Sequence, residues 1–155
     1  MSLELKRVEK KVGQDTHIYR TDLVFKKNTI NILLGSTLAG KTTLMQIMAG
    51  LDKPTSGEIW FDGKDVTGQA VQKRNVSMVY QQFINYPNFT VFENIASPLK
   101  ITGIDSKEIK KRVGEVADLL KLSGMLNKKP NELSGGQQQR TALARALVKD
   151  SGLIL

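Results

Sequence analysis

Apolar and polar positions alternate in two short segments near the N-terminus, residues 3–8 and residues 18–25. This period of two is typical of strands with one buried face, and the polar residues between the segments favour an antiparallel arrangement. Residues 29–34, which read TINILL, form a short, largely apolar run that ends at Gly35. Such a run is typical of a strand buried on both faces of a parallel sheet. The pattern predicts an α/β protein whose first strands form a separate antiparallel layer.

From residue 41 onward the spacing of the apolar side chains becomes helical. Three of them fall on one face: Leu44, Ile47 and Met48. Gly50 follows this run directly, in the position where a glycine commonly ends a helix. Residues 58–61 (EIWF) and 75–80 (NVSMVY) are short, apolar segments that favour strands. The order of segments therefore predicts a strand, a glycine-containing loop, a helix and further strands.

The second half of the chain is predicted to be helical. Its three helices have residues placed to cap their N-termini: Thr90, Asp105 and Ser134. Pro98 should kink or end the first helix, because proline has no N–H for the helical hydrogen bonds. The second helix is expected to bury one stripe: Ile109, Val113, Val116, Leu119 and Leu120. The third is expected to run from about residue 136 to 149, with an inner face of Ala142, Leu143, Ala146 and Leu147.

The length and composition fit one globular domain. The 155 residues are 40% hydrophobic and 25% charged, close to the averages of globular proteins. We expect a single domain, residues 1–155, that contains a helical subdomain from about residue 87 to 150. No apolar stretch approaches the roughly 18 residues of a membrane span, and the charged N-terminal segment does not resemble a secretory signal. We therefore expect a cytoplasmic protein whose membrane association is at most peripheral.

The net charge of +8 raises the alternative of nucleic-acid binding, because basic surfaces neutralise phosphates. The basic residues are spread along the chain, and their densest cluster, residues 107–112, falls on the second expected helix. Such a cluster is more typical of a solvated helix face, so we expect no nucleic-acid partner. A basic protein also suits anionic nucleotides and an anionic membrane surface. The chain has no cysteine, which excludes disulfides and thiolate zinc sites.

Residues 35–42, GSTLAGKT, match the phosphate-binding pattern G-x-x-x-x-G-K-[ST] between the expected strand and helix. In such a loop the backbone N–H groups point inward, and the start of the helix adds its positive dipole end. Lys41 can reach the β- and γ-phosphates of ATP, and the Thr42 hydroxyl can coordinate Mg²⁺. The expected contacts with ATP are Gly35, Ser36, Thr37, Leu38, Ala39, Gly40, Lys41, Thr42 and Thr43. The alternative is an ordinary strand, turn and helix in which Lys41 is solvated.

A second motif, LSGGQQQR at residues 133–140, opens the third expected helix. Exposed N–H groups and the helix dipole make such an N-terminus suitable for a γ-phosphate. Behind a phosphate loop, this octapeptide resembles the signature motif of ABC ATPases. The resemblance implies that two copies of the domain enclose two ATP molecules, with the partner's nucleotide contacted by Ser134, Gly135, Gly136 and Gln137. The alternative is a plain helix cap with flexible glycines.

Residues 78–100 resemble the Q-loop region of ABC importers for carbohydrates. Gln81 matches the glutamine that contacts Mg²⁺ and the attacking water, and its neighbour Gln82 is an alternative. The aromatic residues here are more typical of core or groove lining than of a cofactor site: Tyr80, Phe83, Tyr86, Phe89 and Phe92. In the family this region receives a helix of a transmembrane permease subunit. The resemblance implies a subunit at the inner face of the membrane that powers the import of a sugar or polyol.

The chain departs from the family's pattern at two positions near the nucleotide. Leu38 stands where the phosphate loop usually has a third glycine, so the positive φ angles of such loops are less accessible. Val12 stands where an aromatic residue usually stacks on adenine. His17 or Tyr19 could support the base instead, although strand packing is the favoured interpretation of both. We expect ATP binding to be retained with altered affinity.

The resembled family carries its Walker B Asp, catalytic Glu and switch His beyond the position of Leu155. We therefore expect an α/β P-loop NTPase fold of the ABC ATPase type, with the C-terminal part of its parallel core missing. Lys41 and Gln81 are the catalytic candidates, ATP and Mg²⁺ the expected cofactors, and the 155-residue chain is expected to bind nucleotide without hydrolysing it.

Two other functions stay open at this point. One is an ABC-type ATPase of DNA repair or translation, which shares both motifs. Such proteins usually carry an inserted module between the motifs, and the interval from Lys41 to Gln81 leaves no room for one. The other is a module that holds nucleotide as a regulatory ligand without turnover. A turnover measurement on the complete protein separates this module from an ATPase.

Overall fold

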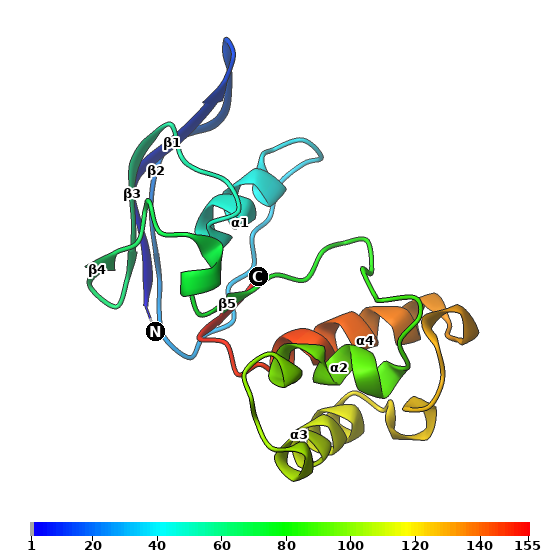
Figure 1. Ribbon diagram of the computed structural model, residues 1–155. Helices are drawn as coiled ribbons and strands as arrows, with labels where there is room; N and C mark the ends of the chain where they lie inside the picture. Colours follow the sequence, from blue (N-terminus) through cyan, green and yellow to red (C-terminus); the bar gives the residue numbers. More distant parts are fainter. Residues whose placement is uncertain (1) are drawn as a thin grey trace. The chain divides into compact units, whose positions relative to one another are not determined.

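The computed structural model describes residues 2–155, which divide into two compact units (Figure 1). The first unit contains residues 2–76 together with Leu155, and the second contains residues 77–154. The first is built on a β-sheet with one helix, and the second is built mainly from helices. None of the helices in residues 2–155 has the length and apolar character needed to cross a bilayer.

The sheet of the first unit has four antiparallel strands. In spatial order they are β2 (Asp15–Phe25), β1 (Leu3–Val12), β3 (Ser56–Phe61) and β4 (Lys64–Asp65). Leu5 of β1 lies opposite Leu23 of β2 on one side and Ile59 of β3 on the other. The predicted antiparallel pair is therefore confirmed, and both strands are longer than the alternating segments suggested.

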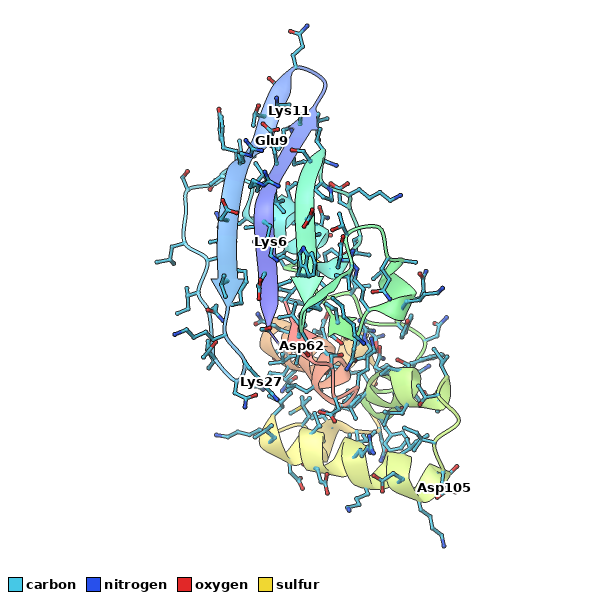
Figure 2. The ribbon with its side chains drawn as sticks, turned by 90° about the vertical axis from the view of Figure 1, so that its left-hand side faces the viewer. Lys6, Glu9, Lys11, Lys27, Asp62 and Asp105 are labelled. Atoms are coloured by element: carbon cyan, nitrogen blue, oxygen red, sulfur yellow. The ribbon has the colours of Figure 1, made fainter. Side chains whose placement is uncertain are left out.

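The two faces of this sheet differ in character, as the alternation of side chains requires. Figure 2 shows Lys6, Glu9 and Lys11 following one another along β1, with α1 (Lys41–Ala49) behind the sheet. Lys6 lies 3.9 Å from the centre of the Trp60 ring, so a cation–π contact holds part of the outer face. The buried apolar residues of the strands and of α1 are Leu3, Leu5, Val8, Ile18, Leu44, Ile47, Met48, Ala49, Ile59 and Phe61.

The strand expected at residues 29–34 is wrong. This segment has no regular secondary structure, and the side chains of Ile30 and Leu34 are 94% and 85% exposed. A strand buried on both faces needs hydrogen-bonded neighbours and a covering layer on each side. Among residues 2–155 no strand pairs with this segment, so its backbone gains nothing from an extended ladder.

The second expected core strand is much shorter than residues 75–80. Only Val76–Ser77 form a strand (β5), which belongs to a two-stranded sheet with β6 (Leu153–Ile154). A short 3₁₀ helix, η1 (Val71–Lys73), precedes it. The described residues thus form the predicted antiparallel layer and, apart from it, a sheet of two short strands.

Helix α1 ends at Gly50 against a buried arginine. Gly50 has φ 81°, and a methyl group there would lie 2.6 Å from Nε of Arg74. Arg74 is 5% exposed, and its guanidinium donates to five backbone carbonyls: those of Ile47, Met48, Val66, Thr67 and Gln69. Burial lowers the pKa of Arg74, and Asp65 acts in the opposite sense. The cation thus satisfies carbonyls at the C-terminal, negative end of the helix dipole.

Replacing Arg74 with methionine should lower the free energy of unfolding of the full-length protein by about 3 kcal/mol, because several buried carbonyls would lose their donor. Urea denaturation of the parent and the variant measures this difference. Lys73→Met is the matched control, since Lys73 is the exposed neighbouring cation, and its effect should stay within about 0.5 kcal/mol. Equal effects of the two substitutions would contradict the assigned role of Arg74.

The second unit is built on α2 (Val91–Lys100), α3 (Ser106–Leu119) and α4 (Gly135–Leu147), with two short 3₁₀ turns, η2 (Ser123–Met125) and η3 (Pro130–Glu132). The helix α2 packs against both α3 and α4 (Figure 1). One buried apolar cluster joins the three helices and the loops between them: Val91, Ile95, Ala96, Leu99, Ile109, Val113, Ala117, Leu122, Leu133, Ala144 and Val148. The predicted helices are confirmed.

All three predicted N-caps are confirmed. Thr90 and Ser134 form complete capping boxes with Glu93 and Gln137, and the Asp105 carboxylate accepts from the N–H of Lys107. Pro98 was expected to kink or end the helix, and the second expectation is wrong, because α2 continues to Lys100. Proline leaves the carbonyl four residues earlier without its helical donor. The Ser97 hydroxyl takes that place, donating to the Asn94 carbonyl over 2.8 Å.

The predicted helix faces are correct in part. Leu119 is 71% exposed, and Ala117 takes its place in the buried stripe of α3. On α4, Thr141 and Ala144 are buried, whereas Leu143 and Leu147 are only partly covered. The buried face of α4, on which α2 packs, therefore consists of small side chains. The prediction had assigned this face partly to the larger leucines.

Candidate functional site

The phosphate loop of residues 35–42 leads directly into α1. Gly40 is the N-cap of that helix, with φ 81° and ψ 9°, a left-handed conformation that favours glycine. A methyl group at this position would lie 2.6 Å from the backbone oxygen of His17 and 2.7 Å from Cδ1 of Ile18. Both the backbone angle and the close approach of β2 therefore require glycine at residue 40.

The N-terminus of α1 has no side-chain cap. A glycine N-cap cannot accept hydrogen bonds from the first turn, and no acidic residue lies in that turn, all of which is described. Its N–H groups and the positive end of the helix dipole are therefore available to an anion. This arrangement differs from α2 and α4, where Thr90 and Ser134 accept hydrogen bonds from the first turn.

The Lys41 ammonium lies over the loop. Its Nζ donates to the Gly35 carbonyl over 2.9 Å and to the Ser36 carbonyl over 2.6 Å. An ammonium has three N–H donors, so one remains for a further acceptor such as a phosphate oxygen. Thr42 is exposed beside it, which leaves its hydroxyl accessible to a metal ion bridging phosphates. The residues present thus fit a Mg²⁺-nucleotide.

Leu38 is the unusual residue of this loop. It has φ 66°, in the left-handed region that is strained for a residue with a Cβ, and its side chain is 97% exposed. The family's glycine would adopt this angle without strain. The loop thus reaches the positive φ at Leu38 at an energetic cost that a glycine would remove.

Leu38→Gly should tighten Mg-ATP binding by the full-length protein about fivefold, because relief of about 1 kcal/mol of backbone strain favours the binding-competent loop. Isothermal titration calorimetry compares the two dissociation constants. Leu38→Ala is the control: alanine removes the exposed side chain but keeps the Cβ and therefore the strain. An equal gain in Leu38→Ala would show that side-chain bulk, not the backbone angle, sets the affinity.

The residues considered for adenine lie on β1 and β2, and β2 is the strand that approaches this loop at Gly40. Val12 is 50% exposed at the end of β1, and Tyr19 is 77% exposed on β2. Ile18 is the β2 side chain that faces Gly40. Because side chains alternate along a strand, His17 and Tyr19 project from the opposite face. This placement disfavours a stacking role for His17 and for Tyr19.

The signature segment begins α4 in the second unit. Ser134 and Gln137 bond to each other's backbone: the Ser134 hydroxyl accepts from the Gln137 N–H, and the Gln137 side-chain oxygen accepts from the Ser134 N–H over 2.8 Å. The predicted cap is confirmed, and the Ser134 hydroxyl hydrogen stays available for a ligand. Ser134 and Gln137, which are predicted to contact nucleotide, thus also stabilise the start of α4.

Packing within the second unit does not require glycine at residues 135 and 136. Neither has a positive φ, and a methyl group at Gly136 would meet no atom within 4 Å. At Gly135 the nearest neighbour would be the Phe83 ring, at 4.0 Å. Larger residues would fit at both positions within the second unit. Glycine here leaves the helix N-terminus open to close approach by a group from outside the unit.

Gln81 is exposed in an irregular segment of the second unit. The structure thus places Gln81 and Ser134–Gln137 in one unit and the phosphate loop, Gly35–Thr43, in the other.

One organising residue was missed from the sequence. Asn94 of α2 is fully buried, and its side chain holds the preceding aromatic segment through four backbone contacts. Its amide nitrogen donates to the carbonyls of Tyr86, Phe89 and Thr90, and its oxygen accepts from the Tyr86 N–H. The Thr90 N–H in turn lowers the pKa of Glu93, the partner in the capping box. An asparagine among apolar residues of a predicted helix was the available signal.

The sequence profile of the ABC transporter family matches residues 19–155, and the chain belongs to this family. The chain is 43% identical over 97% of its length to an Fe(3+) ions import ATP-binding protein, FbpC, of Vibrio cholerae. It is 41% identical over its whole length to a probable sulfate/thiosulfate import ATP-binding protein, CysA, of Chlorella vulgaris. It spans 43% of the first relative and 66% of the second.

Solved structures confirm the fold class. The ATP-binding cassette MJ0796, in a dimer bound to ADP and Pi, superposes with a TM-score of 0.86 at 33% sequence identity. The match covers 98% of this chain and 72% of that one. A second dimeric structure of MJ0796 gives a TM-score of 0.87. The chain thus has the fold of an ABC ATP-binding cassette, and the relatives named for iron and sulfate import do not support the expected closeness to sugar importers.

Proposed function

We propose that this chain is the nucleotide-binding part of an ATP-binding subunit of an ABC importer, and that the complete protein hydrolyses ATP to drive solute across a membrane. The observation that carries the proposal is the start of α1, where Gly40 leaves the first turn uncapped and Lys41 lies over the loop. The importer assignment rests on the names of the relatives. It follows that the subunit acts at the cytoplasmic face of the membrane with permease subunits.

In this function Mg-ATP would be held by the loop Gly35–Thr43. The N–H groups of the first turn of α1 and the Lys41 ammonium would neutralise the phosphates, and Thr42 and Gln81 would ligate the metal. Bound Mg²⁺ would neutralise charge that develops between the β- and γ-phosphates. The signature residues Ser134–Gln137 would contact the γ-phosphate in a second copy of the subunit, consistent with the dimeric cassettes of the same fold.

The solute is proposed to be an inorganic ion. Some relatives are named for the import of Fe(3+) ions and another for the import of sulfate or thiosulfate. Each of these alignments includes nearly all of this chain. The cassette itself does not contact solute in this scheme, so the solute is a property of the complete transporter.

The test is ATP hydrolysis by the full-length protein, alone and reconstituted in liposomes with the permease subunits that copurify with it from its source cells. The proposal expects hydrolysis that rises more steeply than linearly with protein concentration and is stimulated by the permease. Binding without turnover would favour a regulatory nucleotide-binding module. Stimulation by DNA or ribosomes in place of permease would favour the repair or translation class.

A further inference from the structure

The nucleotide site proposed above depends on a short helix. α1 has nine residues, fewer than the roughly 12–15 that an isolated helix needs in water. Its N-cap is a glycine, and among its nine described residues the first turn has no acidic side chain and the last turn no basic one. The side chains of α1 therefore do not complement the dipole at either end. Contacts from elsewhere in the first unit have to hold the helix with its free N–H groups directed at the phosphates.

At the N-terminal end, β2 limits where the helix can begin. A methyl group at Gly40 would lie 2.6 Å from the backbone oxygen of His17 and 2.7 Å from Cδ1 of Ile18, so the backbone here is close against the strand. This contact fixes the position of the first turn. A rigid rod that is held at one end can still tilt, so the direction of α1 depends on what holds its other end.

Arg74 holds the C-terminal end of α1. Its Nη1 donates to the carbonyls of Ile47 and Met48, in the last turn, over 3.4 Å and 3.1 Å. Nε and Nη2 of the same guanidinium donate to three carbonyls of residues 66–69, in the loop that follows β4. One planar cation with five N–H donors thus joins the last turn to another part of the unit. Its charge also lies at the negative end of the helix dipole.

The glycine that ends α1 makes room for this cation. A methyl group at Gly50 would lie 2.6 Å from Nε and 2.7 Å from Cζ of Arg74, which is too close without displacement of the guanidinium. Lys10 also reaches this region, but its ammonium bonds to Asp52 and to the Lys53 carbonyl, both of which follow the helix. The contact of Arg74 is with the last turn itself.

We propose that Arg74 is a positioning residue for nucleotide binding, which acts through α1 by holding the last turn so that the first turn meets the phosphates. This inference rests on the proposed function, in which the first turn of α1 binds the phosphates of ATP. Without Arg74 the last turn is released, and the N–H groups at the other end lose their fixed direction. Contacts made equally in the ground state and the transition state are weakened, so KM rises and kcat is retained.

The experiment compares the full-length parent with Arg74→Met, at a temperature at which circular dichroism shows both to be folded. Isothermal titration calorimetry should show the dissociation constant of Mg-ATP raised at least tenfold. Steady-state hydrolysis should show a matching rise in KM, with kcat within threefold of the parent. Hydrogen exchange of the amides of residues 45–49 should be faster in the variant. A dissociation constant within twofold of the parent would overturn the inference.

Leu3→Ala is the matched control that separates positioning from stability. Leu3 is buried at the start of β1, whereas Ile18, the β2 residue that approaches Gly40, pairs near the other end of that strand. Truncation of a buried leucine should destabilise the unit to an extent comparable with Arg74→Met, which urea denaturation of both variants verifies. Its affinity for Mg-ATP should stay within twofold of the parent. An equal loss of affinity in this control would show that Arg74 contributes stability alone.

Two further variants cover the case in which methionine at residue 74 prevents folding. Arg74→Lys keeps the charge but has only three donors, so it should bind Mg-ATP more weakly than the parent and more tightly than Arg74→Met. Gly50→Ala keeps Arg74 but displaces its guanidinium from the helix end, and it should weaken binding at least fivefold. Parent-like affinity in both variants would refute the positioning role. A parent protein that does not bind Mg-ATP would instead count against the proposed function.

Discussion

Lys41→Ala is expected to weaken the binding of Mg-ATP by the full-length protein at least 100-fold. The ammonium of Lys41 is held over the loop by the carbonyls of Gly35 and Ser36, with one donor left for a phosphate. Its removal takes the only long cation from the loop, and charge-assisted hydrogen bonds to phosphates contribute about 1.5–3 kcal/mol each. Isothermal titration calorimetry with Mg-ATP gives the two dissociation constants.

Lys27→Ala is a suitable control for the loss of positive charge. Lys27 is exposed in the same unit and lies outside the loop. The control should bind Mg-ATP within threefold of the parent, because exposed charges at a distance are screened by salt. A Lys41→Ala protein with affinity within threefold of the parent would show that residues 35–42 are an ordinary turn.

Gly136→Asp in the full-length protein is expected to spare Mg-ATP binding and to reduce hydrolysis at least 100-fold. The new carboxylate would lie at the N-terminus of α4, where the γ-phosphate of the partner's nucleotide is proposed to bind, and like charges would oppose closure of the dimer. The side chain has room, because a Cβ at this position meets no atom within 4 Å. An acidic residue in the first turn also stabilises a helix, so the thermal midpoint should not fall.

Gly136→Asn and Gly136→Ala separate charge from size in this experiment. Asparagine has nearly the shape of aspartate without its charge, and it should retain more turnover than aspartate does. Alanine should retain most of the turnover if only charge matters at this position. Steady-state hydrolysis of Gly136→Asp equal to that of the parent would refute the proposed role of the signature residues in the second copy.

The local structure could be predicted wherever the determinant lies within a few residues. The caps at Thr90, Asp105 and Ser134 follow from short-range hydrogen bonds, and the sequence pattern identified all three. The start of α1 after Gly40 was likewise predicted from the spacing of the motif, and its geometry depends on the left-handed angle of Gly40. The local conformation of such motifs is determined by residues within the motif itself.

The failures concern features that depend on distant parts of the chain. Residues 29–34 have the composition of a central strand, but a strand exists only with partners, and residues 2–155 provide none. Arg74 is one of 23 basic residues, and its burial against the end of α1 could not be predicted from the neighbouring sequence.

Pro98 shows how a correct local rule can be overridden. Proline does remove the hydrogen bond to the Asn94 carbonyl, as expected. The Ser97 hydroxyl supplies a replacement, and the apolar side chains on either side of Pro98 remain buried against α3 and α4. The helix therefore continues for two residues past the proline, because tertiary packing outweighs the local penalty.

A crystal structure of the full-length protein with Mg²⁺ and a non-hydrolysable ATP analogue tests the proposed nucleotide site most directly. We expect phosphates within hydrogen-bonding distance of the N–H groups of residues 40–43 and of Nζ of Lys41. We also expect Ser134–Gln137 of a second copy to lie against the γ-phosphate. A nucleotide bound elsewhere, with Lys41 and the first turn of α1 in solvent, would refute the proposed nucleotide site.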